Sequence, residues 1–193
     1  MERTKNTSEA RQRILETADR LFYQDGIRAV GIDRIIAEAA VAKMSLYKHF
    51  SSKDDLILAV LKYREERILE FFGTAMERHG KRTKDKLRAF FAALKDWFES
   101  PGFRGCAFQN AAVELADPNH PGSDFVKGHK RRFQEFLSGL IEESLGKGAA
   151  KVAPVVGLLV EGAIVTAVIQ GSPDAVDVAR DAALKLVAEA KGV

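Results

Sequence analysis

The stretch from Lys43 to Lys53 carries side chains whose chemistry suits contact with a nucleic acid. Lysine ammonium groups neutralise phosphates, and serine and tyrosine hydroxyls donate hydrogen bonds to phosphate oxygens or base edges. Among these polar residues stand the apolar Leu46 and Phe50, which recur at helical spacing. The pattern predicts a short helix that buries one side and presents a basic, hydroxyl-bearing side to DNA. The predicted DNA-contacting residues are Lys43, Met44, Ser45, Tyr47, Lys48, His49 and Lys53.

A second short helix precedes this one, so that the pair forms two helices joined by a tight turn. Apolar residues recur at helical spacing from Ile32 to Ala39, and an earlier helix ending at Gly26 offers an apolar stripe that supports both. The chain's whole excess of three positive charges falls within residues 1–53. A local basic field attracts a phosphate backbone and predicts salt-dependent binding. A solvated helical hairpin is the alternative interpretation of the two helices.

The rest of the chain is predicted to be helical, because no stretch shows sustained period-two alternation. A long helix from about Asp54 to Arg78 connects the basic N-terminal residues 1–53 to five further helical segments. These segments are separated by breaks rich in Gly, Pro and Asp. We expect an all-α fold with an N-terminal three-helix domain, residues 1–53, and a C-terminal six-helix domain, residues 54–193. The five later segments are about Thr83–Glu99, Cys106–Leu115, Ser123–Leu145, Val152–Gln170 and Asp174–Ala190.

The chain resembles the tetracycline-repressor (TetR) family of bacterial one-component regulators, with motif-level resemblance over roughly residues 10–60. The specific signal is the spacing from the helix-ending Gly26 to the signature Tyr47, Phe50 and Lys53. That resemblance implies a helix-turn-helix DNA-binding head, a larger domain that binds a small molecule, and a homodimer formed by the last two helices. It also implies that Tyr47 and Lys53 hold phosphates and that ligand binding releases DNA. The other matching residues are Ile14, Ala18, Leu21, Phe22, Val41, Leu46 and Leu56.

Three positions in the head depart from the family pattern. Gly31 stands where the family usually has Thr, and it is a weaker but permissible helix cap. Ile36 stands at a position that is usually Ala and needs extra room between the helices. Ala40 replaces a turn glycine, and a positive φ there would cost a non-glycine residue about 1 kcal/mol.

The middle of the chain is rich in Phe residues, with a few polar residues between them. Large apolar walls with few polar groups are typical of a small-molecule pocket between helices, and equally of an ordinary core. A buried polar side chain needs a partner, and a ligand can be that partner. The predicted ligand-binding residues are Trp97, Cys106, Asn110, Glu114 and His129.

Cys106 supports an alternative function, a redox or electrophile sensor, because nearby Arg104 could lower the pKa of the thiol. A small buried thiol is the competing structural interpretation. With one cysteine the chain can form neither an internal disulfide nor a cysteine cluster for a metal. A metal site from the acidic and histidine residues between Glu114 and His129 lacks a tight ligand pair, so no metal is expected.

The last two predicted helices offer more apolar surface than one side of a small bundle usually buries. Two such pairs related by a twofold axis would bury the surplus in a four-helix interface and present two recognition helices together. The operator is then expected to be palindromic. The predicted dimer-interface residues are Val156, Leu159, Val160, Ala163, Ile164, Ala167, Ala183 and Leu186.

Several function classes are excluded by what the sequence lacks. It contains no phosphate loop, nucleophile elbow, paired-histidine zinc helix or dinucleotide glycine pattern, so we expect no enzyme and no cofactor. No secretory leader is apparent, which favours the cytoplasm, and Glu161 interrupts the apolar run Val152 to Ile169, which argues against a membrane span. We expect a homodimeric repressor that binds a double-stranded DNA operator and is released by a small, largely apolar effector. A helical protein-interaction module without DNA binding is the rival interpretation.

Overall fold

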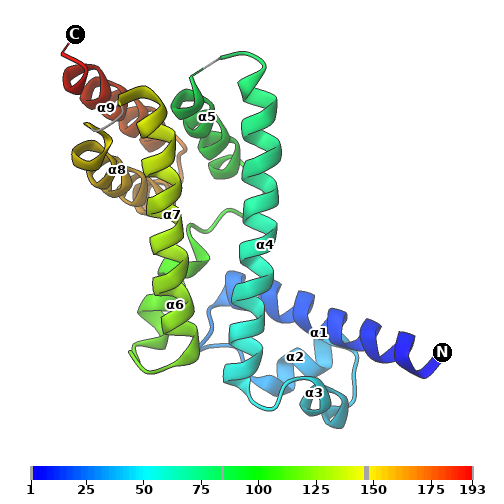
Figure 1. Cartoon of the computed structure of the whole chain (residues 1–193). Helices are drawn as coiled ribbons and strands as arrows, with labels where there is room; N and C mark the ends of the chain where they lie inside the picture. Colours follow the sequence, from blue (N-terminus) through cyan, green and yellow to red (C-terminus); the bar gives the residue numbers. More distant parts are fainter. Residues whose placement is uncertain (1, 84, 146–147, 193) are drawn as a thin grey trace. The chain divides into compact units, whose positions relative to one another are not determined.

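The computed structural model of the chain describes residues 2–83, 85–145 and 148–192, and within these ranges it contains helices and no strand (Figure 1). The predicted all-α fold is therefore confirmed, and each predicted helix is present with ends shifted by a few residues. The helices are α1 Glu2–Asp25, α2 Ile32–Ala39, α3 Lys43–His49, α4 Lys53–Gly80, α5 Lys86–Phe98, α6 Ala107–Leu115, α7 Pro121–Leu145, α8 Ala149–Gln170 and α9 Ala175–Ala190.

The helices form two compact units, and the long helices α4 and α7 each contribute to both. The first unit holds the chain up to Arg67 together with Ala107–Gly128, so it contains α1 to α3, the start of α4, α6 and the start of α7. The second unit holds Ile68–Cys106 and the chain from His129 onward. The domain boundary at residue 53 stays a prediction, but α1 to α3 belong to the same unit as α6, which comes much later in the sequence.

The core of the first unit lies where α1 packs against α2 and α3. It also contains one buried charge, Asp19 of α1, which is 3% exposed. Its carboxylate accepts a hydrogen bond from Arg64 Nε at 2.6 Å and lies 3.4 Å from Arg67 Nη1. A buried charge is costly unless it is paired, so these arginines of α4 join α4 to α1. The fully buried apolar residues of this unit are Ile14, Ala18, Leu21, Val30, Ile35, Leu46, Leu56 and Ala111.

The turn between α2 and α3 confirms the positive φ expected at Ala40. Ala40 adopts the left-handed conformation, with φ 51° and ψ 51°, and its N–H donates to the carbonyls of Ile36 and Ala37. Gly31 caps α2 without a side-chain hydrogen bond, and Ile36 is half-buried. The helix-turn-helix is therefore formed despite a strained alanine and a weak cap.

Replacing Ala40 by glycine is expected to stabilise the protein by about 0.5–1 kcal/mol. Glycine removes the steric cost of a positive φ, and part of that gain is offset by the greater freedom of glycine in the unfolded chain. Thermal and urea unfolding followed by circular dichroism measure the change. The control is Gly171→Ala at the end of α8, where φ is 64° and the space for a Cβ is open, so it should destabilise by a similar amount. An Ala40→Gly variant no more stable than the parent would show that the turn is not strained.

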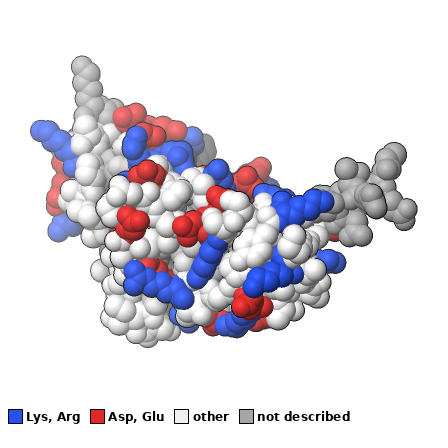
Figure 2. All heavy atoms as spheres, turned by 90° about the horizontal axis from the view of Figure 1, so that it is seen from below, with Lys and Arg blue, Asp and Glu red and all other residues white. Residues whose placement is uncertain are grey.

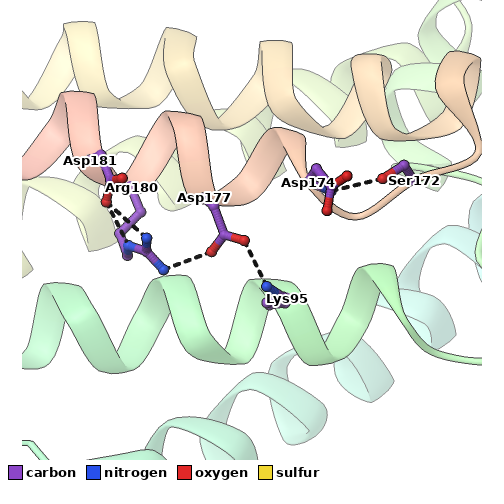
Figure 3. Close-up of polar contacts among 6 residues, drawn as sticks. All are labelled: Lys95, Ser172, Asp174, Asp177, Arg180 and Asp181. Atoms are coloured by element: carbon purple, nitrogen blue, oxygen red, sulfur yellow. Dashed lines mark hydrogen bonds and ion pairs between the residues drawn. The ribbon is translucent and has the colours of Figure 1, made fainter.

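The second unit is held by α9, which packs against both α8 and α5. At the edge of this contact Lys95 of α5 donates to Asp177 of α9 at 2.6 Å, and Arg180 contacts Asp177 at 2.6 Å and Asp181 at 2.9 Å (Figure 3). The hydrogen bond from Lys95 lowers the pKa of Asp177, and the charge of Arg180 acts in the same direction. The stabilisation from this carboxylate is therefore present at neutral pH and is lost as the pH falls below the ordinary aspartate range.

Among the described residues, one helix is long and apolar enough to cross a membrane by length and composition, and that helix is α8. A core helix of a soluble protein passes the same test, and 44% of the apolar window of α8 is buried inside the protein. Pro154, which interrupts the apolar run in the sequence, lies within the first turns of α8. It is the sixth residue of the helix and has no N–H, so the carbonyl of Ala150 lacks its usual hydrogen bond within α8.

Candidate nucleic-acid interface

The recognition helix α3 has its buried and exposed residues on opposite sides. Leu46 is fully buried against the core of the first unit, whereas Met44 is 80% exposed and Tyr47 is 43% exposed. Single exposed apolar side chains are common on protein surfaces, and this exposure leaves Met44 accessible to the edge of a DNA groove. Of the other predicted residues of α3, Lys43 and Lys48 are exposed, and Ser45 and His49 are half-buried.

Basic side chains near α3 are partly engaged with acidic neighbours. Lys43 Nζ lies 3.3 Å from Asp33 Oδ1, and both side chains are exposed. Arg34 of α2 contacts Asp25 and Glu38, each at 2.8 Å. Figure 2 views the molecule from the side on which α2 and α3 lie, and there Lys and Arg stand in separate groups with acidic groups between them. Because exposed ion pairs are weak, phosphates can compete for these cations, but the face is not a continuous basic surface.

A basic residue of α1, which was not among the predicted DNA contacts, lies at the end of α3. The guanidinium carbon of Arg11 is 5.2 Å from the centroid of the Phe50 ring, in the residue that follows α3. Burial lowers the pKa of His49, and the charges of Lys48 and Arg11 lower it further. Arg11, Lys48 and His49 therefore form one basic cluster. The sequence pattern could not place Arg11 beside α3, since their distance depends on how the two helices pack.

DNA binding is expected to strengthen by about three- to tenfold as the pH falls from 7.5 to 5.5. His49 is held neutral in the free protein by its lowered pKa, whereas a nearby phosphate favours the imidazolium form, so binding takes up a proton. The affinity gain appears as the pH falls through and below the ordinary histidine pKa of 6.5. Fluorescence anisotropy with a labelled operator fragment measures it. His49→Gln should remove the gain, and an equal gain in that variant would contradict the assignment.

Lys53, which was predicted to hold a phosphate, is half-buried and has a partner within the protein. Its Nζ donates to the carbonyl oxygen of Ile27 at 2.6 Å and lies 5.8 Å from the centroid of the Phe22 ring. Burial lowers the pKa of Lys53, and the carboxylates of Asp54 and Glu114 oppose that shift. The phosphate contact stays a prediction, while the structure gives Lys53 a contact with the turn between α1 and α2.

The five residues predicted to bind a ligand are divided between the two units. Asn110 and Glu114 belong to α6 in the first unit and line a small cavity together with residues of α1 and α4. Trp97, Cys106 and His129 belong to the second unit, where Cys106 is buried and the other two are half-buried. Within the described residues no group of three His, Cys, Asp or Glu side chains is arranged to hold a metal ion.

Trp97 is part of an aromatic cluster in the second unit. Neighbouring rings of this cluster have centroids 4.9 to 6.3 Å apart, a spacing typical of favourable aromatic pairs. The cluster accounts for much of the high Phe content in the middle of the chain. Its members are Phe71, Phe72, Phe90, Phe91, Trp97, Phe98, Phe103, Phe133 and Phe136.

Cys106 lies beside a cation other than the Arg104 that its sequence neighbourhood suggested. Lys130 Nζ of α7 donates to Cys106 Sγ at 3.4 Å and to the two carboxylate oxygens of Glu161 at 2.7 and 2.8 Å. The carboxylate neutralises much of the positive charge near the thiol, and Cys106 is only 6% exposed. This geometry is typical of a polar cross-link between α7 and α8, and thiol sensing stays a prediction.

Most of the predicted dimer-interface residues are buried within a single chain and do not face outward. The reason is that α8 is apolar around most of its circumference, so helical spacing alone cannot tell its inward side from its outward side. The outward side carries instead an exposed α8 stripe formed by Val155, Leu158, Val165 and Ile169, which are 43%, 74%, 46% and 78% exposed. Of the predicted set, Leu159 and Leu186 are half-buried, and those buried within a single chain are Val156, Val160, Ala163, Ile164, Ala167 and Ala183.

Two family models match the chain and together cover most of it. The model for bacterial regulatory proteins of the tetR family matches residues 14–60, and the model for a tetracyclin repressor-like C-terminal domain matches residues 83–183. An HTH-type transcriptional activator, FasR of Mycolicibacterium smegmatis, is 37% identical over 107 residues, which are 54% of this chain and 48% of that protein. An HTH-type transcriptional regulator of Staphylococcus aureus is 33% identical over 91 residues, 47% of this chain and 45% of that protein. The chain thus spans about half the length of these curated relatives.

Solved structures match over nearly the whole chain. A TetR-family transcriptional regulator from Streptomyces coelicolor is 36% identical, with a TM-score of 0.85, and the match covers 95% of this chain and 97% of that chain. A TetR transcriptional regulator from Chloroflexus aurantiacus is 26% identical, with a TM-score of 0.79, and the match covers 95% of this chain and 96% of that chain. Both similarities extend through the helix-turn-helix and the helices that follow it.

Proposed function

This chain belongs to the TetR family of DNA-binding transcriptional regulators, and on that premise we propose that it is a repressor which a small, largely apolar molecule releases from a palindromic operator. The family consists of regulators and not of enzymes. The proposal concerns the sign of regulation, the form of the operator and the effector. We argue DNA contact from α3, the dimer from the exposed α8 stripe and the effector site from the aromatic cluster.

The observation that carries the proposal is the exposure of α3. Met44 and Tyr47 point to solvent while Leu46 anchors the helix, so the helix can enter a major groove without disturbing the core. We assign base contacts to Lys43, Met44 and Ser45, and backbone contacts to Tyr47 and Lys48. The basic cluster with Arg11 extends the backbone contacts beyond the helix.

TetR-family regulators usually form homodimers, and the exposed α8 stripe is the surface that we assign to the dimer. Together with Gly162, its residues recur at intervals of three and four, which is the spacing of a helix–helix seam. Gly162 lies between them and has open space where a Cβ would be, so a second helix can approach closely. A twofold axis through this seam relates two recognition helices, and a palindromic operator follows from that symmetry.

The effector site that we propose lies beside the aromatic cluster of the second unit. Aromatic walls favour an apolar ligand, and the Lys130 and Glu161 pair offers a polar anchor at the edge. Trp97 reports on this region because it is the single tryptophan and is half-buried among Phe72, Phe98 and Phe103. Quenching or a spectral shift of its fluorescence therefore identifies effectors in a panel of metabolites and drugs.

A mobility-shift assay with the DNA upstream of the chain's own gene tests the proposal. We expect a shift that weakens steeply with salt and that an effector found by Trp97 fluorescence reverses. A transcription assay on the same fragment then gives the sign, since a repressor lowers transcription whereas an activator raises it. Absence of any salt-sensitive shift would favour the protein-interaction module instead.

A further inference from the structure

The turn between α1 and α2 is held from two sides by residues that lie far away in the sequence. The backbone N–H of Arg28 donates to Glu114 Oε2 of α6 at 3.0 Å, across 86 positions of the chain. On the other side, Lys53 Nζ donates to the carbonyl of Ile27 at 2.6 Å. The backbone of Arg28 is thus bound by the carboxylate of Glu114 from α6, and the backbone of its neighbour Ile27 is bound by the ammonium group of Lys53 at the start of α4.

Glu114 approaches this turn at the glycine that ends α1. Gly26 has a φ of +93°, which other residues rarely adopt, so the left-handed turn favours glycine there. A Cβ on Gly26 would lie 2.9 Å from Glu114 Oε2, so any other residue would also displace the carboxylate. The carboxylate of Glu114 also opposes the lowering of the Lys53 pKa that burial causes, so the two charged groups act on each other.

The turn matters for DNA binding because the helix-turn-helix follows it directly. Val30 is fully buried two residues after Arg28, and α2 begins at Ile32. A shift of the turn therefore moves α2, and α3 moves with it because the two helices are joined by only three residues. A small cavity lies beside Glu114 and is lined by residues of α1, α4 and α6.

We propose that Glu114 and Lys53 are positioning residues for the recognition helix: they hold the turn at Gly26–Arg28 and so keep α2 and α3 in the arrangement that binds DNA. This inference rests on the proposed DNA-binding function and deepens it. Lys53 acts through the turn and not on a phosphate. The turn before the two short helices is thus held by a glutamate that comes long after it in the chain.

The first test compares Glu114→Ala with Glu114→Gln in operator binding. Glu114→Ala should weaken binding about tenfold, because the Arg28 N–H loses its acceptor. Removing a negative charge by itself favours DNA binding, so this weakening is opposite in sign to the simple electrostatic effect. Glu114→Gln keeps an acceptor oxygen and should recover most of the affinity. The controls are Val113→Ala on the same helix and Asp124→Ala, which removes one exposed acid from the first unit.

The second test uses Lys53→Met and the dependence of affinity on salt. A positioning residue lowers the affinity and leaves the slope of log affinity against log salt unchanged, whereas a lost phosphate contact reduces the slope by about 0.9 per protomer. The Lys53→Arg variant should keep part of the affinity that Lys53→Met loses, because a guanidinium can still donate to the Ile27 carbonyl. The double variant of Lys53→Met with Glu114→Ala should lose less than the sum of the single losses, since both residues hold one turn.

Amide hydrogen exchange at Arg28, followed by NMR on the free protein, separates this inference from the proposed function. Glu114→Ala should speed exchange at Arg28 and leave amides of α8 and α9 unchanged. Unchanged exchange at Arg28 would show that Glu114 does not hold the turn, whether or not the protein binds DNA. Faster exchange in a protein that shows no DNA binding would confirm that Glu114 holds the turn and refute its role in operator affinity. Wild-type-like operator affinity of Glu114→Ala, or a reduced salt slope in Lys53→Met, would overturn the positioning roles.

Discussion

A Leu158→Glu variant is expected to be monomeric and to lose at least about hundredfold in affinity for a two-site operator. Leu158 is 74% exposed at the centre of the exposed α8 stripe, so the folded monomer can present a glutamate there to water. In a twofold dimer the same substitution brings two carboxylates into one apolar seam, where desolvation and like-charge repulsion oppose association. A monomer binds only one half-site of the operator, so the affinity gained by linking two binding events is lost.

Size-exclusion chromatography with light scattering measures the mass, and anisotropy on the paired and single half-sites measures the affinity. The matched control is Val113→Glu, which places the same charge at a 79% exposed apolar position of α6 and should leave the mass unchanged. Leu159→Glu is a poorer probe, because Leu159 is half-buried and a charge there disturbs the fold. A Leu158→Glu protein that stays dimeric would show that the dimer does not use this stripe.

The second large effect is expected from the double variant Tyr47→Ala and Lys48→Ala, which should weaken operator binding about hundredfold. Both side chains are exposed on α3, so their loss removes a hydroxyl donor and a cation from each recognition helix without opening a cavity. Because a dimer carries two copies, losing the Lys48 contacts should reduce the salt slope by about 1.8.

Binding measured between low and moderate salt gives both quantities. Lys62→Ala removes one exposed positive charge from α4 and serves as the control, with little change expected in either quantity. Tyr47→Phe, combined with wild-type Lys48, isolates the hydroxyl and should cost less than Tyr47→Ala. If the double variant bound as tightly as the parent while the parent bound in a salt-sensitive manner, another surface of the protein would have to meet the DNA.

The positions of the helices followed from local features that a sequence displays directly. Apolar spacing, a glycine after α1 and acidic residues at the start of α4 are properties of consecutive residues, so α2, α3 and α4 were found within a few residues of their ends. The strain at Ala40 was equally readable, because a tight turn between two short helices restricts its backbone.

The buried face of α8 could not be predicted from the spacing of apolar residues. Val156 and Leu158 are both apolar, and one is fully buried whereas the other is 74% exposed. Hydrophobic spacing separates two faces only when one of them is polar. The packing of α9 against α8 decides which residues are core and which remain for a partner.

The sequence alone determined that this protein is an all-helical chain with a basic recognition helix, because amphipathic spacing and turn chemistry act over a few neighbouring residues. Only the tertiary structure decided that Lys53 and Glu114 hold the turn before that helix, that Arg11 joins its basic end, and that the exposed α8 stripe faces outward. These features depend on contacts between residues distant in the chain, and no local pattern specifies which distant residues meet.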